Sequence, residues 1–219
     1  HRVDRRQRQM CIRDRDYNTL VSAPADPTRN GYTFDGWYSD IALTTPYTFT
    51  TIPASNISLY AKWTIDQYTI TFNSNGGSSV IAITQDYNTS VTQPANPTRT
   101  GYTFSAWYSD AGLTTPYAFT TMPASSISLY AKWNINQYTI TFISNGGTAV
   151  TAITQDYNTS VTQPADPTKT GYTFDAWYSD IALTTPYTFT TMPANNITVY
   201  AKWNINQYTI TFNSNGGSS

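Results

Sequence analysis

Hydrophobic and polar residues alternate in short segments along the chain. In residues 67–72 (QYTITF), aromatic and aliphatic side chains alternate with threonines, which is the period-2 pattern of a half-buried β-strand. Asn-Gly-Gly follows at 75–77, and Asn-Gly is a strong hairpin signal because both residues tolerate positive φ. The Val-, Ile- and Thr-rich residues 80–87 then predict a second strand that returns antiparallel to the first.

Two more strands are expected further along. Residues 93–102 hold two prolines and a glycine, and proline removes hydrogen-bond donors from a sheet, so they predict a loop. Residues 102–108 (YTFSAWY) predict the third strand. Residues 126–133 (SISLYAKW) predict the last strand, with Leu129 on one face and Tyr130 on the other.

The segment between the last two predicted strands has room for one short helical turn. It would lie within residues 109–119, capped by Ser109 or Asp110 and ended before Pro116. No segment shows a sustained 3.6-residue apolar period, so the predicted fold class is mainly β. Each unit would be a mixed or antiparallel sheet of about four strands with at most one short helix. Large aromatic residues are expected to form its small core: Tyr68, Phe72, Tyr102, Phe104, Trp107, Phe119 and Trp133.

The whole pattern recurs with a period of 70 residues, since GYTF begins at Gly31, Gly101 and Gly171. A fixed period of this kind indicates tandem structural repeats. The hairpin at 75–77 needs both of its strands, so a unit should begin at Gln67. The expected organisation is residues 1–15 outside the repeats, 16–66 as a truncated unit lacking its first hairpin, 67–136 and 137–206 as complete units, and 207–219 as the first strand of a truncated unit.

The linkers between units are short. Residues 64–66, 134–136 and 204–206 contain neither glycine nor proline. Linkers of about three such residues should restrict rotation between the units. We therefore expect a semi-rigid string of units.

Three segments together resemble a known family. YTITFNSNGG, NPTRTGYTFSAWYSD and SISLYAKW, in this order and spacing, resemble the internalin B-type B-repeat, also called the Listeria–Bacteroides repeat. The resemblance covers nearly all of residues 16–219. It implies a β-grasp-like unit in which a small sheet packs on a short helical or loop segment. It also implies tandem arrays in secreted or wall-anchored bacterial surface proteins. In that family the repeats act mainly as stalks, and some copies are implicated in adhesion. The family pattern includes no catalytic residues or cofactors.

Residues 1–15 differ from the rest of the chain. They hold six of the twelve Lys and Arg residues, the single Cys and the single His. The letters MCIRDR resemble translated sequencing-adapter read-through; the alternative is a genuine linker or the end of another domain. Arg13 stands where the other copies have Ile83 and Ile153, and a charge at a half-buried strand position has no evident reason. We expect 1–15 to be non-native and to pack poorly, and 16–66 to be the least well formed copy.

Charge and composition exclude several classes of partner. Residues 16–219 carry six basic and eleven acidic residues, hence a net charge of −5. Nucleic-acid binding needs clustered Lys and Arg, so we expect no nucleic-acid partner. No apolar run approaches the roughly 20 residues that span a bilayer, so we expect no membrane insertion in this fragment. The absence of Cys in 16–219 excludes disulfides there.

The sequence offers little for catalysis, and we expect no enzyme. Nucleophilic catalysis needs a base beside its nucleophile, and residues 16–219 contain neither His nor Cys. Asp35 and Asp40 are a conceivable carboxylate pair, but Ser105 replaces Asp35 in the second copy, which favours solvated or capping roles. The segment DIALTTPY lacks the alternating oxygen ligands of a calcium loop. We therefore expect no catalytic residues, no metal and no cofactor.

Two functional hypotheses remain, both for an extracellular protein at the bacterial cell surface or in the cell wall. The first is a stalk that presents other domains away from the cell, with neighbouring repeats as its partners. The second is an adhesive module that contacts host protein or glycan through exposed aromatics. The candidate adhesive face is Tyr60, Tyr130 and Tyr200, which recur once per copy opposite the Leu and Trp positions, so that avidity would add weak contacts.

Overall fold

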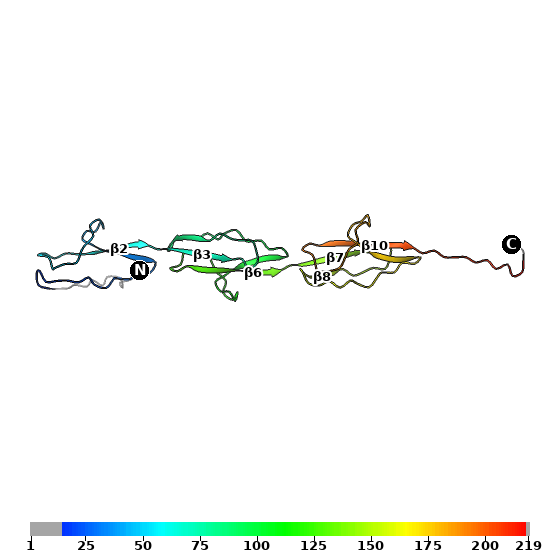
Figure 1. Ribbon diagram of the computed structural model, residues 1–219, viewed down its shortest axis with the longest axis horizontal. Helices are drawn as coiled ribbons and strands as arrows, with labels where there is room; N and C mark the ends of the chain where they lie inside the picture. The colour runs from blue at the N-terminus through cyan, green and yellow to red at the C-terminus, as the bar shows by residue number, and fades with distance from the viewer. Residues whose placement is uncertain (1–14, 218–219) are drawn as a thin grey trace, which may run out of the picture. The chain divides into compact units, whose positions relative to one another are not determined.

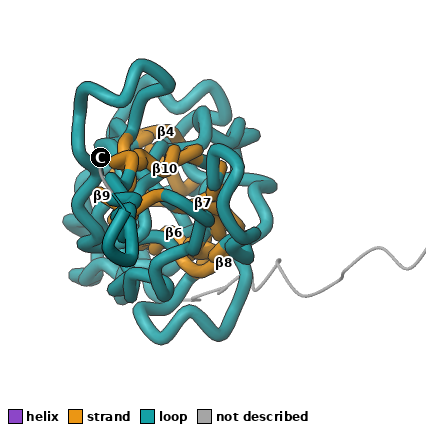
Figure 2. The backbone as a smooth tube through the Cα atoms, turned by 90° about the vertical axis from the view of Figure 1, so that its right-hand side faces the viewer, coloured by secondary structure: helices purple, strands orange, loops and turns teal. Residues whose placement is uncertain are grey.

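The computed structural model describes residues 15–217, and this part of the chain consists of strands, turns and loops without a helix (Figure 2). The predicted mainly-β class is confirmed. The segment 109–119, which had room for one short helical turn, forms a non-helical turn instead. The Asp110 carboxylate accepts hydrogen bonds from the backbone N–H groups of Thr114 and Thr115, at 3.1 and 2.8 Å, and Leu113 has φ 54°. A left-handed residue cannot continue a helix, so the segment closes as a tight turn.

Ten strands form three sheets within residues 15–217 (Figure 1). The first repeat has a two-stranded sheet of β1 (Tyr32–Tyr38) and β2 (Tyr60–Ile65). The second has β3 (Gln67–Asn73), β4 (Ile83–Asp86), β5 (Tyr102–Tyr108) and β6 (Ile127–Ile135), in the order β4-β3-β6-β5. The third has β7 (Gln137–Ile143), β8 (Ile153–Asp156), β9 (Tyr172–Tyr178) and β10 (Ile197–Ile205), in the order β8-β7-β10-β9.

The contacts divide the chain into two compact units. One unit runs up to Thr71 and includes Ala82–Gln93 and Phe119–Ile127; the other holds Phe72–Ile81, Pro94–Ala118 and the chain from Ser128 onward. The division passes through the second repeat. The third repeat lies within one unit and therefore serves below to describe the packing.

The sheet of the third repeat is mixed. Strands β7 and β8 pair antiparallel, as do β9 and β10, whereas β7 and β10 pair parallel, with Ile140 opposite Ile197 and Phe142 opposite Val199. The long excursion between β7 and β10 makes the parallel pairing possible, because parallel neighbours need a crossover connection. Val161 and Met192, from the loop segments of this repeat, belong to the same buried cluster as residues of β7, β9 and β10.

The first hairpin of each complete repeat is antiparallel, as predicted, but it is not a tight two-residue hairpin. Strand β3 pairs with β4 only over Gln67–Ile70. Asn75 and Gly76 have positive φ, 47° and 86°, as an Asn-Gly turn requires. The Asn75 side-chain amide donates a hydrogen bond of 2.8 Å to the carbonyl of Ala131. The turn is therefore tied to β6 and does not close directly onto β4.

The core of the third repeat combines one tryptophan with aliphatic residues. Trp177 is 1% exposed, and the rings of Phe142 and Phe174 contact it edge-on at centroid distances of 4.9 and 5.5 Å. Such pairs contribute about 0.5–1.5 kcal/mol each beyond area burial. The buried cluster is Ile140, Phe142, Val161, Trp177, Met192, Val199 and Ala201.

The second repeat buries a similar set, which corrects the expected aromatic core. Of the seven aromatic residues predicted for it, only Trp107 is fully buried, and the other six are half-buried. Ile70, Met122 and Leu129 are each 0% exposed. The core of this repeat is therefore built from aliphatic side chains, a methionine and one tryptophan, and the other six aromatic residues keep part of their surface in solvent.

The first repeat has the smaller core. Within residues 15–66 no apolar side chain is fully buried, and Trp37, the counterpart of Trp107 and Trp177, is half-buried. Strand β2 has six residues, whereas β6 and β10 have nine. These observations agree with the expectation that 16–66 is the least well formed copy. The expectation that residues 1–15 pack poorly concerns residues that lie almost wholly outside the described part of the chain.

Candidate functional site

The most elaborate constellation lies where one repeat follows another, around Asn136. The backbone N–H of Asn136 donates to the carbonyl of Gly101 at 2.9 Å, and the N–H of Tyr157 donates to the carbonyl of Asn136 at 2.8 Å. The hydroxyl of Thr103 donates to the Asn136 side-chain oxygen at 2.7 Å. Both backbone polar groups and the side chain of this linker residue thus have partners from the two adjoining repeats.

A tyrosine ring closes the same junction. The Tyr157 ring lies on Gly101 so closely that a Cβ on this glycine would be 2.0 Å from Cδ1 of the tyrosine. The rings of Tyr102 and Tyr138 contact Tyr157 edge-on at 6.1 and 6.4 Å. A side chain at position 101 would displace the ring, which explains the glycine in GYTF. We call Gly101, Asn136 and Tyr157 a Gly–Tyr junction.

An equivalent junction connects the first and second repeats. Here Asp66 takes the place of Asn136: its N–H donates to Gly31 at 3.0 Å and its carbonyl accepts from Tyr87 at 2.8 Å. The Tyr87 ring lies on Gly31, at 2.1 Å from the position of a Cβ. The pKa of the Tyr68 hydroxyl is raised, first because surrounding atoms reduce its hydration and then because of the nearby Asp66 carboxylate.

A third copy of this arrangement, at Gly171, has no tyrosine ring over the glycine among the described residues. The N–H of Asn206 donates to Gly171 at 2.9 Å, as at the other junctions. Among the described residues, no atom comes within 4 Å of a Cβ built on Gly171. Tyr172 and Tyr208 are 36% and 78% exposed. The acceptor half of a Gly–Tyr junction is therefore formed here without a covering ring.

The three candidate adhesive tyrosines occupy equivalent strand positions. Tyr60, Tyr130 and Tyr200 lie on β2, β6 and β10, each paired with the last tyrosine of the neighbouring strand, Tyr38, Tyr108 and Tyr178. Tyr60 is 37% exposed, and the other two are half-buried. Each ring therefore presents part of its surface to solvent.

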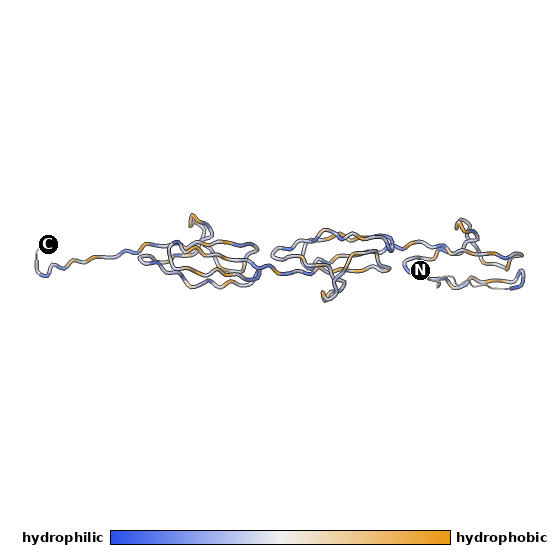
Figure 3. The backbone as a smooth tube through the Cα atoms, turned by 180° about the vertical axis from the view of Figure 1, so that it is seen from behind, coloured by the Kyte–Doolittle hydropathy of each residue, from blue (hydrophilic) through white to orange (hydrophobic). Residues whose placement is uncertain are grey.

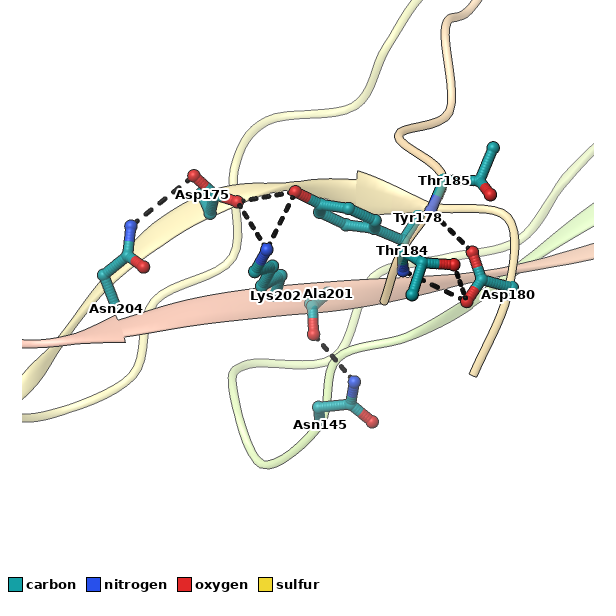
Figure 4. Close-up of polar contacts among 9 residues, drawn as sticks. All are labelled: Asn145, Asp175, Tyr178, Asp180, Thr184, Thr185, Ala201, Lys202 and Asn204. Atoms are coloured by element: carbon teal, nitrogen blue, oxygen red, sulfur yellow. Dashed lines mark hydrogen bonds and ion pairs between the residues drawn. The ribbon is translucent and has the colours of Figure 1, made fainter. Parts of the chain in front are cut away.

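A polar cluster beside these strands was not predicted. Lys202 Nζ lies 3.2 Å from the Tyr178 hydroxyl, 3.9 Å from the Asp175 carboxylate and 4.7 Å from the centroid of the Tyr178 ring (Figure 4). The Tyr178 hydroxyl donates to Asp175 at 2.9 Å. A partly exposed ion pair of this kind adds little stability, but it holds a cation over an aromatic ring.

The same cation–aromatic pair occurs in every repeat. Lys62 lies 4.9 Å from the Tyr38 ring, and Lys132 lies 4.9 Å from the Tyr108 ring. The second repeat has Ser105 in place of Asp175, so its lysine lacks that carboxylate. The sequence does carry a signal for this pair: the lysine of the recurring YAKW segment and the tyrosine of the recurring WYSD segment lie on neighbouring strands.

The carboxylates considered for catalysis have structural partners. Asp180, like Asp40 and Asp110, accepts hydrogen bonds from backbone amides in its own turn, here from Thr184 and Thr185 at 3.1 and 2.7 Å (Figure 4). These hydrogen bonds hold the pKa of Asp180 below its ordinary value, and the bond from the Thr184 amide has the largest effect. Asp35, in contrast, accepts the hydroxyl of Thr64. Asp35 and Asp40 are thus bonded within separate local arrangements.

An open cleft of about 690 Å³ lies beside the turn of the third repeat. Lys169, Tyr172 and Trp203 line it together with glycines and threonines. Lys169 Nζ donates to the carbonyl of Asn145 at 2.9 Å and lies 4.4 Å from the Tyr172 ring.

The residues from 15 to 217 contain no group of three or more His, Cys, Asp or Glu placed to hold a metal. Over the same range, no helix has the length and apolarity needed to cross a membrane.

Tandem all-β units joined by Gly–Tyr junctions define a repeat-array protein. The chain belongs to the Listeria-Bacteroides repeat domain family, which matches residues 10–62, 68–132 and 138–202. The first match begins six residues ahead of Asp16, and the origin of residues 1–15 stays a prediction.

Curated relatives contain the same repeats within much longer chains. A "Putative Gly-rich membrane protein" of Evansella cellulosilytica is 42% identical over 206 residues, which is 93% of this chain and 24% of that protein. Internalin H of Listeria monocytogenes is 41% identical over 123 residues, which is 54% of this chain and 22% of internalin H. The chain thus spans about a quarter of the length of the curated relatives it matches.

Proposed function

We propose that the chain is a stalk or spacer segment of a bacterial cell-surface protein and presents other domains away from the cell. The Gly–Tyr junction carries this proposal. At both junctions, two backbone hydrogen bonds and a ring stacked on glycine join one repeat to the next. Contacts of this kind reduce the rotation that a bare linker of three residues would allow, and a spacer must resist such rotation to keep its length.

An extracellular location at the cell surface or in the wall accompanies this role. The similarity to internalin H and to a relative named as a membrane protein supports it. We also propose that the segment is not an enzyme and uses neither cofactor nor nucleic acid. The carboxylates of its turns accept bonds from their own backbone, which is a structural use of these groups.

Small-angle X-ray scattering tests the spacer. A compact globule of this length would have a radius of gyration of about 17 Å, whereas three units of about 11 Å each, joined in series, would give about 27 Å. We expect the larger value for the whole chain, extrapolated to zero concentration. A flexible Gly-Ser insertion after Asn136 is the control and should broaden the distribution of distances. A radius near 17 Å would contradict the spacer.

Adhesion is the second candidate function, favoured by the partial exposure of Tyr60 and its two counterparts and by the lysine–tyrosine pairs beside them. A surface with aromatic rings next to cations has the groups needed to bind a host protein or a glycan. The double variant Tyr130→Ala, Tyr200→Ala should then reduce binding to immobilised host-cell glycans or matrix proteins by roughly tenfold or more, because avidity multiplies weak contacts. Tyr17→Ala, at an exposed tyrosine off these strands, is the control. Unchanged binding by the double variant would eliminate this function.

A further inference from the structure

The turn that follows β7 contains an Asn-Gly pair. Figure 3 shows hydrophobic positions interleaved with hydrophilic ones along the chain, and residues 144–148 (SNGGT) hold no hydrophobic side chain. Asn145 and Gly146 have φ 48° and 87°, and both residues are exposed. An asparagine that precedes glycine loses its side-chain amide readily, because glycine has no Cβ to hinder attack by its backbone nitrogen. This turn therefore carries a chemically reactive group on the surface of the third repeat.

Side-chain hydrogen bonds hold this turn against the rest of the repeat. The Asn145 side-chain amide donates to the carbonyl of Ala201 on β10 at 2.7 Å (Figure 4). Lys169 Nζ donates to the Asn145 carbonyl at 2.9 Å, and the indole N–H of Trp203 donates to the Ser144 carbonyl at 2.8 Å. Strand β10 lies inside the sheet, between β7 and β9. The side-chain amide of Asn145 thus ties the turn to an inner strand.

We infer that Asn145 is a site of spontaneous deamidation, and that the reaction releases the turn from β10. The Gly146 nitrogen loses its proton and bonds to Cγ of Asn145, the Cγ–Nδ2 bond breaks, and the amide nitrogen leaves with that proton as ammonia. Water then opens the resulting succinimide ring. Hydrolysis at Cγ leaves aspartate, and hydrolysis at the backbone carbonyl leaves isoaspartate, in which the main chain runs through Cβ and Cγ. The net reaction consumes water and releases ammonia, so it needs no other reagent.

The product cannot restore the tie to β10. A carboxylate has no N–H to donate to the carbonyl of Ala201, a residue that is 0% exposed, and two oxygens would meet where the amide now donates. Gly147 packs against the indole of Trp203, since a Cβ built on this glycine would be 2.4 Å from Cζ2 of the tryptophan. Movement of the turn therefore uncovers Trp203. Because deamidation in water runs in one direction, released turns accumulate with the age of the chain.

The second repeat carries the same Asn-Gly pair with an additional hydrogen bond. The Asn75 side-chain amide donates to β6 at 2.8 Å, as that of Asn145 donates to β10. The backbone N–H of Asn75 also donates to the Asn73 side-chain oxygen at 3.0 Å, whereas the third repeat has Ile143 at the equivalent position, whose side chain offers no acceptor. Asn75 is half-buried and Asn145 is exposed. Attack requires the side chain to leave its hydrogen bond, so the rate follows the fraction of open turns, and Asn145 should react before Asn75.

Peptide mass spectrometry of the 219-residue chain, aged at mildly alkaline pH, tests the site. In the folded chain the acid form should accumulate roughly fivefold faster at Asn145 than at Asn75. In guanidinium chloride the two rates should be equal, because both asparagines stand in the same SNGG sequence. Ile143→Asn should slow the reaction of Asn145 to the rate of Asn75, and the reciprocal Asn73→Ile should speed that of Asn75. Conversion at Asn145 that is absent, or no faster than at Asn75, would overturn the inference.

Hydrogen exchange at the Trp203 indole tests the release of the turn. Asn145→Asp reproduces the aspartate product at an exposed position, and it should speed exchange of the indole N–H, which donates to Ser144, by roughly tenfold. Asn145→Ala removes the same donor without adding a carboxylate and should speed the exchange less. Asn75→Asp is the matched control: it should speed exchange at Trp133, which donates to the equivalent turn, and leave Trp203 unchanged. Unchanged exchange at Trp203 in Asn145→Asp would refute the release.

Discussion

Gly101→Ala is expected to release Tyr157 from its junction and to destabilise the connection between the second and third repeats by about 2–5 kcal/mol. Two physical effects contribute. Gly101 has φ 78°, and a left-handed conformation costs a residue with a Cβ about 1–2 kcal/mol. The new methyl would also lie 2.0 Å from the Tyr157 ring, so the ring must leave. Its edge-on contacts with Tyr102 and Tyr138, about 0.5–1.5 kcal/mol each, would then be lost.

Gly171→Ala is the matched control within the same chain. Gly171 has φ 81°, so the backbone cost is nearly the same, but no described atom lies within 4 Å of the added carbon. Hydrogen exchange at the Tyr157 amide, which donates to Asn136 at 2.8 Å, is the measurement. Exchange at this amide should accelerate in Gly101→Ala and stay unchanged in Gly171→Ala. Equal behaviour of the two variants would show that the stacked ring does not couple the repeats.

Trp177→Ala should unfold most of the third repeat. Trp177 is 1% exposed and contacts Phe142 and Phe174, and removing a buried tryptophan costs about 3–5 kcal/mol. A unit of roughly 70 residues has a total stability of only about 3.5–10 kcal/mol. Hydrogen exchange measured by mass spectrometry over β7 and β10 should therefore rise toward the unfolded rate, while peptides of β3 and β4 keep their protection.

Trp37→Ala provides the comparison for this substitution. Trp37 is half-buried, in a repeat whose described residues include no fully buried apolar side chain, so its loss should cost clearly less. Trp177→Phe should also be milder than Trp177→Ala, because it keeps most of the packing and removes an indole N–H that has no hydrogen-bond partner among the described residues. If Trp37→Ala were the more damaging change, Trp177 would not be the centre of the core.

The strands were predictable because their signal is local. The segment 67–72 alternates with period 2, and β3 covers Gln67–Asn73; the segment 102–108 matches β5 residue for residue. Residues 109–119 had room for a helical turn but form a non-helical one, because Asp110 accepts hydrogen bonds from the backbone amides of Thr114 and Thr115. An acidic residue before a short polar segment signals a helix cap and a non-helical turn alike.

The junction escaped prediction for a different reason. Its residues, Gly101, Asn136 and Tyr157, are each unremarkable in the sequence, and the contact between Gly101 and Tyr157 spans 56 positions of chain. Sequence reasoning recognised the linkers as short and stiff, but it assigned Gly101 only to a loop. The lysine–tyrosine pairs were missed similarly, since Lys202 and Tyr178 meet only through the antiparallel pairing of β9 and β10.

By itself, the sequence determined that this protein is a tandem array of mainly-β repeats, with strands set by alternating residues and turns set by Asn-Gly. Those features depend on the conformational preferences of a few adjacent residues. Only the tertiary structure decided that β7 and β10 run parallel, that Ile140 and Met192 are buried more completely than most of the aromatics, and that a tyrosine ring lies on a glycine of the preceding repeat. Each of these depends on which distant segments meet, and side-chain packing across those contacts selects among pairings that the local pattern leaves equally possible.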